Sequence, residues 1–426
     1  MPTRRGFFHA VAAAAVVPLL SPRRLDALER QLQESGAMAP GVAAANEDYW
    51  AAVRAMFSAT PDYIHLENGY ASPQPLPNWQ QFMTYATEVN GGLSLYMRRK
   101  HEEDLRRVTA QLAELAGVPA DELVITRNTT ESLATVIHGI DLAPGDEAIM
   151  CNQDYDSMLE QFRQQSRRRG IVCREISLPL HPQSDEEILE HYAAAITPRT
   201  RLLLVTHLIN LTGQVLPVRK IAALAQSHGI RVIVDAAHSF AHIAYTIPEL
   251  GGDFFGTSLH KWLSAPLGAG LLHMKRERIA EVWPLFGDTS VPATDIRKFE
   301  RQGTQPAWTL LAIPNAIRFH QLIGAERKEA RLRYLQQYWT DRVRDIPKVS
   351  VNTPRGDRAC GIGNVGIAGC PPVALAKTLY DRYRIYTVGI DNVAVQGVRI
   401  TPQLFTRTSD LDALVRAITE IAGGAG

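Results

Sequence analysis

The stretch "DFFGTSLHKWLSAPLG", residues 253–268, places one lysine, Lys261, between a histidine and a tryptophan. A short β-like run precedes this lysine, and a Pro/Gly break follows it. Lysine side chains normally extend into water, yet Phe255, Trp262 and Leu263 are apolar neighbours. Lys261 is therefore either a solvated surface residue or an amine held in a desolvated pocket, where it can act as a nucleophile.

Bulk composition narrows the classes of function. The chain has 426 residues, enough for a sizeable core and two domains. Its 45 Lys+Arg and 44 Asp+Glu give a formal charge of +1, which gives no indication of a nucleic-acid or acidic partner. The four cysteines are scattered, with no C-x-x-C and no Cys/His zinc spacing. The sequence therefore predicts no metal site, and the cysteine spacing does not define a set of disulfide bonds.

The N-terminus has the pattern of an export signal. "TRRGFF" (3–8) precedes "HAVAAAAVVPLL" (9–20), an apolar run too short to span a bilayer. The paired Arg4-Arg5 resembles the twin-arginine signal, which predicts export to the periplasm by the twin-arginine machinery. A basic start with a chance alanine run is the alternative. Cleavage at "VAAA" (42–45) and retention as a membrane anchor both remain open, and residues 1–45 are interpreted as signal and linker.

Apolar β runs alternate with helical patterns after the linker. The runs are "ELVIT" (122–126), "DEAIMCN" (146–152), "IVCREISL" (171–178), "RLLLVTHL" (201–208) and "IRVIVDAA" (230–237). This alternation predicts an α/β fold with a mostly parallel sheet and helices on both faces. From about Pro314 a long charged helix is expected to lead into a smaller α+β segment. The predicted domains are a large one over 46–312 and a small one over 313–426.

Ligands bind at the carboxyl ends of strands in such sheets. Asp235 ends one buried strand, where a carboxylate could also simply cap a turn. Thr129 and Thr130 open a helix, and helix starts bind anions. A phosphate at a helix start, a carboxylate facing a pyridinium nitrogen and a lysine forming a Schiff base are the groups that pyridoxal phosphate requires. With Lys261, the sequence contains all three.

Five segments together resemble one family. They are "NTTES" (128–132), "HLINLTG" (207–213), "VDAAHS" (234–239), "GTSLHKWLSAPLGAGLL" (256–272) and "VRITP" (398–402). From about residue 60 onward the chain resembles the class V aminotransferase group of fold-type I pyridoxal-phosphate enzymes. That group includes cysteine desulfurases, kynureninase and the isopenicillin N epimerase-like subgroup. The resemblance implies a sheet of the seven-stranded type and a smaller C-terminal domain.

The resemblance also implies roles for residues around the cofactor. Lys261 would form the Schiff base, and Asp235 would keep the ring nitrogen protonated. His238 and Asn210 would lie near the phenolic oxygen. Tyr155 would lie over the ring face, unless it is an ordinary loop tyrosine. The implied phosphate cradle is Thr129, Thr130, Ser258 and His260. Gly303 and Thr304 would reach the partner subunit's phosphate, which implies a homodimer.

For the substrate, the resemblance assigns Arg399 to an amino-acid carboxylate, with a solvated strand-end arginine as the alternative. Asn68 and Tyr70 resemble a loop that closes over the substrate. Arg98 could reach a second acidic group, or it could belong with Arg99 to a solvated helix face.

Three hypotheses about the reaction remain open. Amino-group transfer on an amino acid or peptide-derived amine is preferred, because the chain resembles exported enzymes of this group that tailor peptide natural products. Epimerisation or racemisation is the alternative, with Lys261 and either Tyr155 or His238 on opposite faces of Cα. A non-catalytic cofactor-binding protein would not need Arg399. C–S lyase chemistry is disfavoured because residues 383–402, before and around the arginine motif, contain no cysteine, and Cys370 is expected to be structural.

Overall fold

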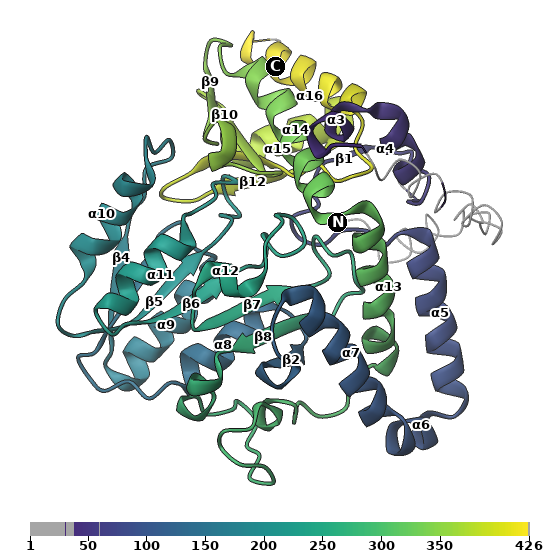
Figure 1. Cartoon of the computed structure of the whole chain (residues 1–426). Helices are drawn as coiled ribbons and strands as arrows, with labels where there is room; N and C mark the ends of the chain where they lie inside the picture. The colour runs from purple at the N-terminus through teal and green to yellow at the C-terminus, as the bar shows by residue number, and fades with distance from the viewer. Residues whose placement is uncertain (1–29, 31–37, 59, 425–426) are drawn as a thin grey trace, which may run out of the picture.

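The computed structural model describes residue 30, residues 38–58 and residues 60–424, and Figure 1 draws the remainder as a grey trace. The twin-arginine motif and the apolar run after it lie outside the described residues. Within the described ranges, no helix is both long and apolar enough to cross a membrane.

A seven-stranded sheet forms the centre of the molecule (Figure 1). Its strand order is β2-β8-β7-β6-β5-β3-β4, and β8 is antiparallel to both of its neighbours while the other pairs are parallel. The strands are β2 (Leu123–Thr126), β3 (Glu147–Cys151), β4 (Val172–Ile176), β5 (Thr200–Thr206), β6 (Arg231–Asp235), β7 (Phe254–Ser258) and β8 (Gly270–Met274). The predicted mostly parallel sheet is confirmed.

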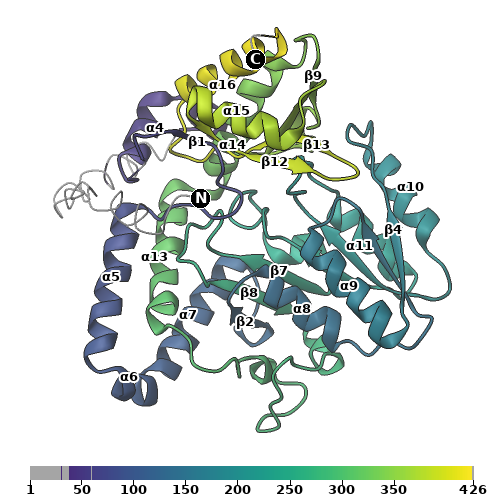
Figure 2. The same ribbon diagram turned by 180° about the vertical axis from the view of Figure 1, so that it is seen from behind.

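Helices cover both faces of this sheet (Figures 1 and 2). In β5, Leu203 and Val205 join one core and Leu202 and Leu204 the other, as the alternation of side chains along a strand requires. The first core includes α7 (His101–Ala116), α10 (Asp185–Ala195), α11 (Val218–Ser227) and α12 (Ile247–Leu250). The second includes α8 (Thr129–Gly139) and α9 (Asp156–Arg169).

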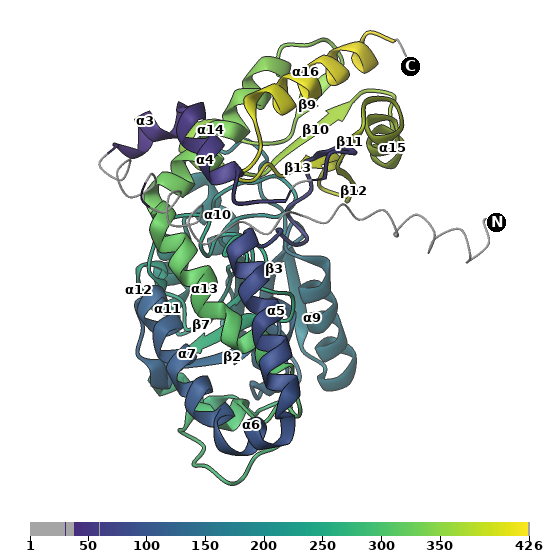
Figure 3. The same ribbon diagram turned by 90° about the vertical axis from the view of Figure 1, so that its right-hand side faces the viewer.

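A smaller four-stranded antiparallel sheet lies above the first (Figure 3), in the order β12-β13-β10-β9. Its strands are β9 (Val349–Val351), β10 (Gly363–Ile367), β12 (Val388–Asp391) and β13 (Gln396–Ile400). Its helices are α14 (Ala325–Val343), α15 (Pro372–Tyr383) and α16 (Thr408–Ala422). The N-terminal strand β1 (Ile64–His65) pairs with β11 (Ile385–Tyr386), so residues near 65 lie beside the C-terminal part of the chain.

The long helix expected from Pro314 is two helices. The first, α13 (Ala307–Ile323), packs on α5 (Leu76–Gly91) and α7. Gly324 then adopts a φ of +85°, which interrupts the helical backbone before α14 begins. Helix α13 starts before residue 312 and packs with the first part of the chain. The domain limits at residues 312 and 313 stay a prediction. The short elements are α6 (Leu93–Arg99), η2 (Ala120–Glu122), η3 (Arg276–Glu281), η4 (Ile296–Phe299) and η5 (Gly356–Arg358).

The linker interpretation is wrong for its last residues. Pro40–Ala45 forms helix α3, which packs on α14 and leads into α4 (Glu47–Arg54). Trp50 Nε1 donates to Ala43 O at 2.7 Å, and Arg331 Nη1 donates to Ala44 O at 2.9 Å. Both alanines are buried. The "VAAA" segment considered as a cleavage site is therefore part of the folded body.

Candidate active site

A cavity of about 330 Å³ opens at the carboxyl edge of the seven-stranded sheet. Strands β6 and β7 end there at Asp235 and Ser258, and helix α8 begins there at Thr129. Predicted site residues that line it are Tyr70, Thr129, Thr130, Tyr155, Asn210, Asp235, His238, Ser258, His260, Lys261 and Arg399. The cavity therefore joins segments that are far apart in the sequence, at the carboxyl ends of the strands, where a ligand is expected to bind.

Lys261 lies at this cavity with its side chain partly buried. Burial lowers the pKa of its amine to about 8, although the nearby Asp235 carboxylate acts in the opposite direction. Lys261 Nζ lies 3.0 Å from His238 Nε2. Of the two interpretations of this lysine, the desolvated amine is the one that the structure supports.

Trp262 fixes the tautomer of His238. Its indole Nε1, which can only donate, lies 3.3 Å from His238 Nδ1, so Nδ1 is the acceptor. Burial keeps the pKa of His238 well below its usual value, so the ring is neutral and its proton is on Nε2. Nε2–H then donates to Nζ, and a nitrogen that accepts this bond must be a free amine. The geometry therefore favours the nucleophilic form of Lys261.

Asp235 belongs to a pair of buried carboxyl groups. Its Oδ1 accepts a hydrogen bond from Ala237 N at 2.9 Å, and burial raises its pKa. The second group is Asp154, whose oxygens accept from Thr206 Oγ1 at 2.6 Å and from Cys151 N at 2.7 Å. Burial raises the pKa of Asp154 to about 7. Sequence analysis missed Asp154, although it directly precedes Tyr155.

The start of α8 forms a cradle for an anion. Asn128 caps the helix by accepting from Glu131 N at 2.9 Å. Ser258 Oγ accepts from Thr129 N at 2.9 Å and lies 2.7 Å from Thr129 Oγ1. A Cβ on Gly270 would lie 2.7 Å from Asn128 Cα, so only glycine lets β8 approach the helix start this closely. Hydroxyls and helix-terminal N–H groups together suit a phosphate.

These residues fit pyridoxal phosphate. The cradle suits its phosphate, and the buried Asp235 carboxyl suits its pyridinium nitrogen. Two buried polar atoms at the cavity, Asn210 Oδ1 and His260 Nδ1, have no hydrogen-bond partner within the described chain. Because buried polar atoms are normally paired, both are expected to bond to a ligand.

At the substrate end, the guanidinium of Arg399 pairs with Glu67. Arg399 Nη2 lies 2.6 Å from Glu67 Oε1, and both side chains are largely buried. Tyr70 N also donates to Glu67 Oε1, at 3.0 Å. Sequence analysis missed Glu67, although it directly precedes Asn68 in the predicted substrate loop.

Four predicted residues do not line the cavity. Asn68 donates to Thr401 O at 2.8 Å and so joins the N-terminal segment to the region after β13. Arg98 and Thr304 line a separate hollow of about 510 Å³, and Gly303 lines a third. The predicted contact of Gly303 and Thr304 with a partner's phosphate stays a prediction.

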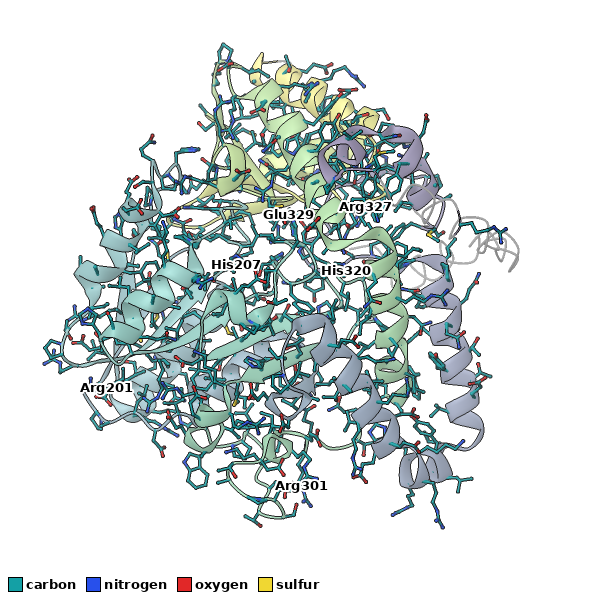
Figure 4. The ribbon with its side chains drawn as sticks, in the orientation of Figure 1. Arg201, His207, Arg301, His320, Arg327 and Glu329 are labelled. Carbon is teal, nitrogen blue, oxygen red and sulfur yellow. The ribbon has the colours of Figure 1, made fainter. Side chains whose placement is uncertain are left out.

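A buried basic side chain links the small sheet's helix α14 to this site. Lys328 Nζ donates to the carbonyl oxygen of Trp262, the residue after Lys261. Burial lowers the pKa of Lys328 to about 7 and that of His320 to about 3. Figure 4 labels His320 and Glu329, which lie near the end of α13 and the start of α14.

Comparison with known proteins identifies relatives along most of the chain. The family model described as aminotransferase class-V matches residues 72–412. The isopenicillin N epimerase of Streptomyces clavuligerus is 26% identical over 393 residues, which cover 88% of this chain and 98% of that protein. A probable cysteine desulfurase of Halobacterium salinarum is 28% identical over 395 residues, covering 84% and 91% respectively.

Among solved structures, the complex of the cystine C–S lyase C-DES with its product cysteine persulfide superimposes with a TM-score of 0.75. It is 20% identical and covers 84% of this chain and 98% of that chain. This likeness shows a shared fold.

Proposed function

The chain belongs to the aminotransferase class-V family, and we propose that it transfers the amino group of an amino acid or a peptide-derived amine. Pyridoxal phosphate is its cofactor. When bound, this cofactor supplies an electron-withdrawing ring that stabilises negative charge at the substrate's Cα. The start of α8 and Ser258 would hold the phosphate, and Asp235 would hold the ring nitrogen's proton.

The observation that carries the proposal is the bond between Lys261 Nζ and His238 Nε2, 3.0 Å long. It favours the free amine of Lys261, the form that can both attack a carbonyl and remove a proton from Cα. His238 reaches the cavity from the lysine's side, because it bonds to the lysine nitrogen itself. It therefore supports Lys261 and does not provide an independent base.

Epimerisation needs a second group that acts on the opposite face of Cα. Tyr155 is the candidate, but burial and the nearby Asp156 raise the pKa of its phenol above the usual value of 10. A phenol that keeps its proton near neutral pH is a poor base. A single base suits a reaction in which the Cα proton is not returned to the opposite face, which favours amino-group transfer.

Epimerisation is nevertheless the second candidate. The similarity to isopenicillin N epimerase covers 98% of that enzyme. Tyr155 lines the cavity, and its 44% exposure leaves the hydroxyl able to exchange its proton with water. A phenol in this place could return a proton to Cα even where it could not remove one.

Persulfide-forming C–S chemistry has little support, because it needs a nucleophilic thiol near the substrate. All four cysteines lie in the described part of the chain, and none of them lines the Lys261 cavity. Burial raises the pKa values of all four thiols, which disfavours the reactive thiolate.

The deciding experiment is an absorption spectrum of the purified holoenzyme, titrated with L- and D-amino acids and short peptides. Amino-group transfer predicts a permanent loss of the visible band, with stoichiometric release of the keto product. Retention of the band, with deuterium entering Cα from heavy water, would instead favour epimerisation. A Lys261→Ala variant that kept the wild-type spectrum and turnover would refute the role of this lysine.

We also propose that the enzyme is a homodimer, with Gly303 and Thr304 at the partner subunit's phosphate site. Light scattering tests the assembly, and a monomer with full activity would contradict it.

Export by the twin-arginine route is proposed from Arg4 and Arg5. Replacing both with lysine should leave the enzyme in the cytoplasmic fraction, while unchanged fractionation would argue against this route.

A further inference from the structure

The ion pair between Arg399 and Glu67 is part of the site's architecture. Arg399 Nη2 lies 2.6 Å from Glu67 Oε1, and Nε lies 3.4 Å from Oε2, so both carboxylate oxygens face the same edge of the guanidinium. The side chains are only 11% and 7% exposed. A carboxylate from the protein itself therefore occupies the two-donor edge that binds carboxylates most strongly.

Other parts of the guanidinium are also in contact with protein. Gly69 lies against it so closely that a Cβ there would be 3.0 Å from Cζ and from Nη2. Nη1 donates to Asn210 O at 3.4 Å. An incoming carboxylate cannot form the side-on two-bond pair unless Glu67 leaves.

Glu67 is held firmly where it is. Thr401, two residues after Arg399, donates its N–H to Leu66 O at 2.8 Å, and residues 67 and 401 form a parallel bridge. Glu67 and Arg399 thus project from neighbouring extended segments whose backbones are bonded to each other. If Glu67 were displaced, its carboxylate would stay buried without its cation, which is costly.

A substrate carboxylate that bound beside the intact pair would meet like charge. The Arg399–Glu67 pair is neutral as a unit, so a third charged group would leave an unbalanced negative charge in a largely buried place. A neutral amide has no such penalty, because it can accept from Nη1 or Nη2 without adding charge. The site is therefore built for a neutral group next to the reacting amine.

The surroundings have room for the rest of such a substrate. A hollow of about 790 Å³ adjoins the cavity, with Leu267 lining both. Its walls include Leu76, Trp79 and Met83. An amine that continues through an amide bond into a larger body could extend over these apolar side chains.

We propose that Glu67 is a specificity-determining residue, which selects amines whose neighbouring carboxyl group is masked in an amide, as in a peptide, over free amino acids. This inference rests on the proposed function. It replaces the free amino-acid carboxylate that the family resemblance assigned to Arg399 with an uncharged amide.

The test uses the holoenzyme and two matched probes, L-phenylalanine and L-phenylalaninamide, titrated against the visible absorption band. Wild-type enzyme should respond to the amide at concentrations about tenfold or more below those needed for the acid. Glu67→Gln should shift this ratio toward the acid by about tenfold or more, because it removes the competing charge. Comparing the ratio between variants cancels the difference between the amine pKa values of the two probes.

Glu281→Gln is the matched control, since Glu281 is likewise paired with arginine, in its case with Arg231 and Arg278, away from the cavity. It should keep the wild-type ratio. Equal response of the wild-type enzyme to both probes, or an unchanged ratio in Glu67→Gln, would overturn the role of Glu67 and leave the proposed function standing. The wild-type comparison decides this even if the variant fails to fold. Absence of a visible band from cofactor-saturated wild-type enzyme would overturn both.

Discussion

Replacing Trp262 with phenylalanine should make Lys261 a weaker nucleophile without touching the lysine itself. The indole N–H, 3.3 Å from His238 Nδ1, keeps the imidazole proton on Nε2, where it donates to the lysine amine. In Trp262→Phe, His238 is free to carry its proton on Nδ1. Its Nε2 lone pair then accepts a bond from the lysine ammonium, so the charged form of Lys261 is stabilised.

The size of the effect follows from the two bonds. A neutral hydrogen bond contributes about 1 kcal/mol and one to a charged group about 1.5–3 kcal/mol. The free amine keeps one neutral bond with either tautomer, whereas the ammonium gains the bond of about 1.5–3 kcal/mol. One pKa unit corresponds to about 1.4 kcal/mol, so the lysine pKa should rise by about 1–2 units. From a starting pKa of about 8, the free-amine fraction near neutral pH should fall about tenfold to a hundredfold.

The assay mixes apoenzyme with pyridoxal phosphate in a stopped-flow instrument and follows the visible band across pH. The apparent pKa of the attachment rate should rise in Trp262→Phe. Trp339→Phe is the control, because Trp339 is also fully buried but its indole nitrogen has no partner within the described residues. An unchanged apparent pKa in Trp262→Phe, or an equal shift in the control, would refute the tautomer argument.

Three further predictions concern stability. Burial lowers the pKa of Lys328 to about 7, so the unfolded state binds more protons above that pH and wild-type stability should rise up to about pH 10. Thermal unfolding of Lys328→Met should lack this part of the rise. Burial raises the pKa of Asp154 to about 7, so wild-type stability should fall between about pH 4 and 7, and urea unfolding of Asp154→Asn should show a smaller fall. Deleting residues 1–45 removes the carbonyls of Ala43 and Ala44 and should cost about 2–5 kcal/mol by urea unfolding relative to a chain that begins at residue 38 and keeps both carbonyls.

The sheet and most of the cavity follow from local sequence pattern. A buried parallel strand appears in the sequence as a short apolar run. The polar residue that ends each run lies at the carboxyl edge of the sheet, which all the parallel strands share. Asp235, Ser258 and the Thr129 helix start are therefore predictable as neighbours without knowledge of strand order. The motifs also follow one another in the order found in class V enzymes, and the family model matches residues 72–412.

The contacts that the sequence did not predict join distant segments through precise geometry. Glu67 and Arg399 are separated by 332 positions and meet only because the backbone around Thr401 pairs with Leu66. The only feature of the sequence that pointed to this pair was a charged residue beside the predicted substrate loop. The break at Gly324 was missed for a different reason, since a helical pattern continues on both sides and only the positive φ interrupts it.

The C-terminal part of the chain supports the site from two sides. Through Arg399 on β13 it holds Glu67 and with it the backbone of the Tyr70 loop. Through Lys328 on α14 it holds the carbonyl of Trp262, whose indole orients the histidine that bonds to Lys261. Both contacts originate in elements packed around the small sheet, so the C-terminal part of the chain holds the substrate end of the site through Arg399 and the lysine end through Lys328.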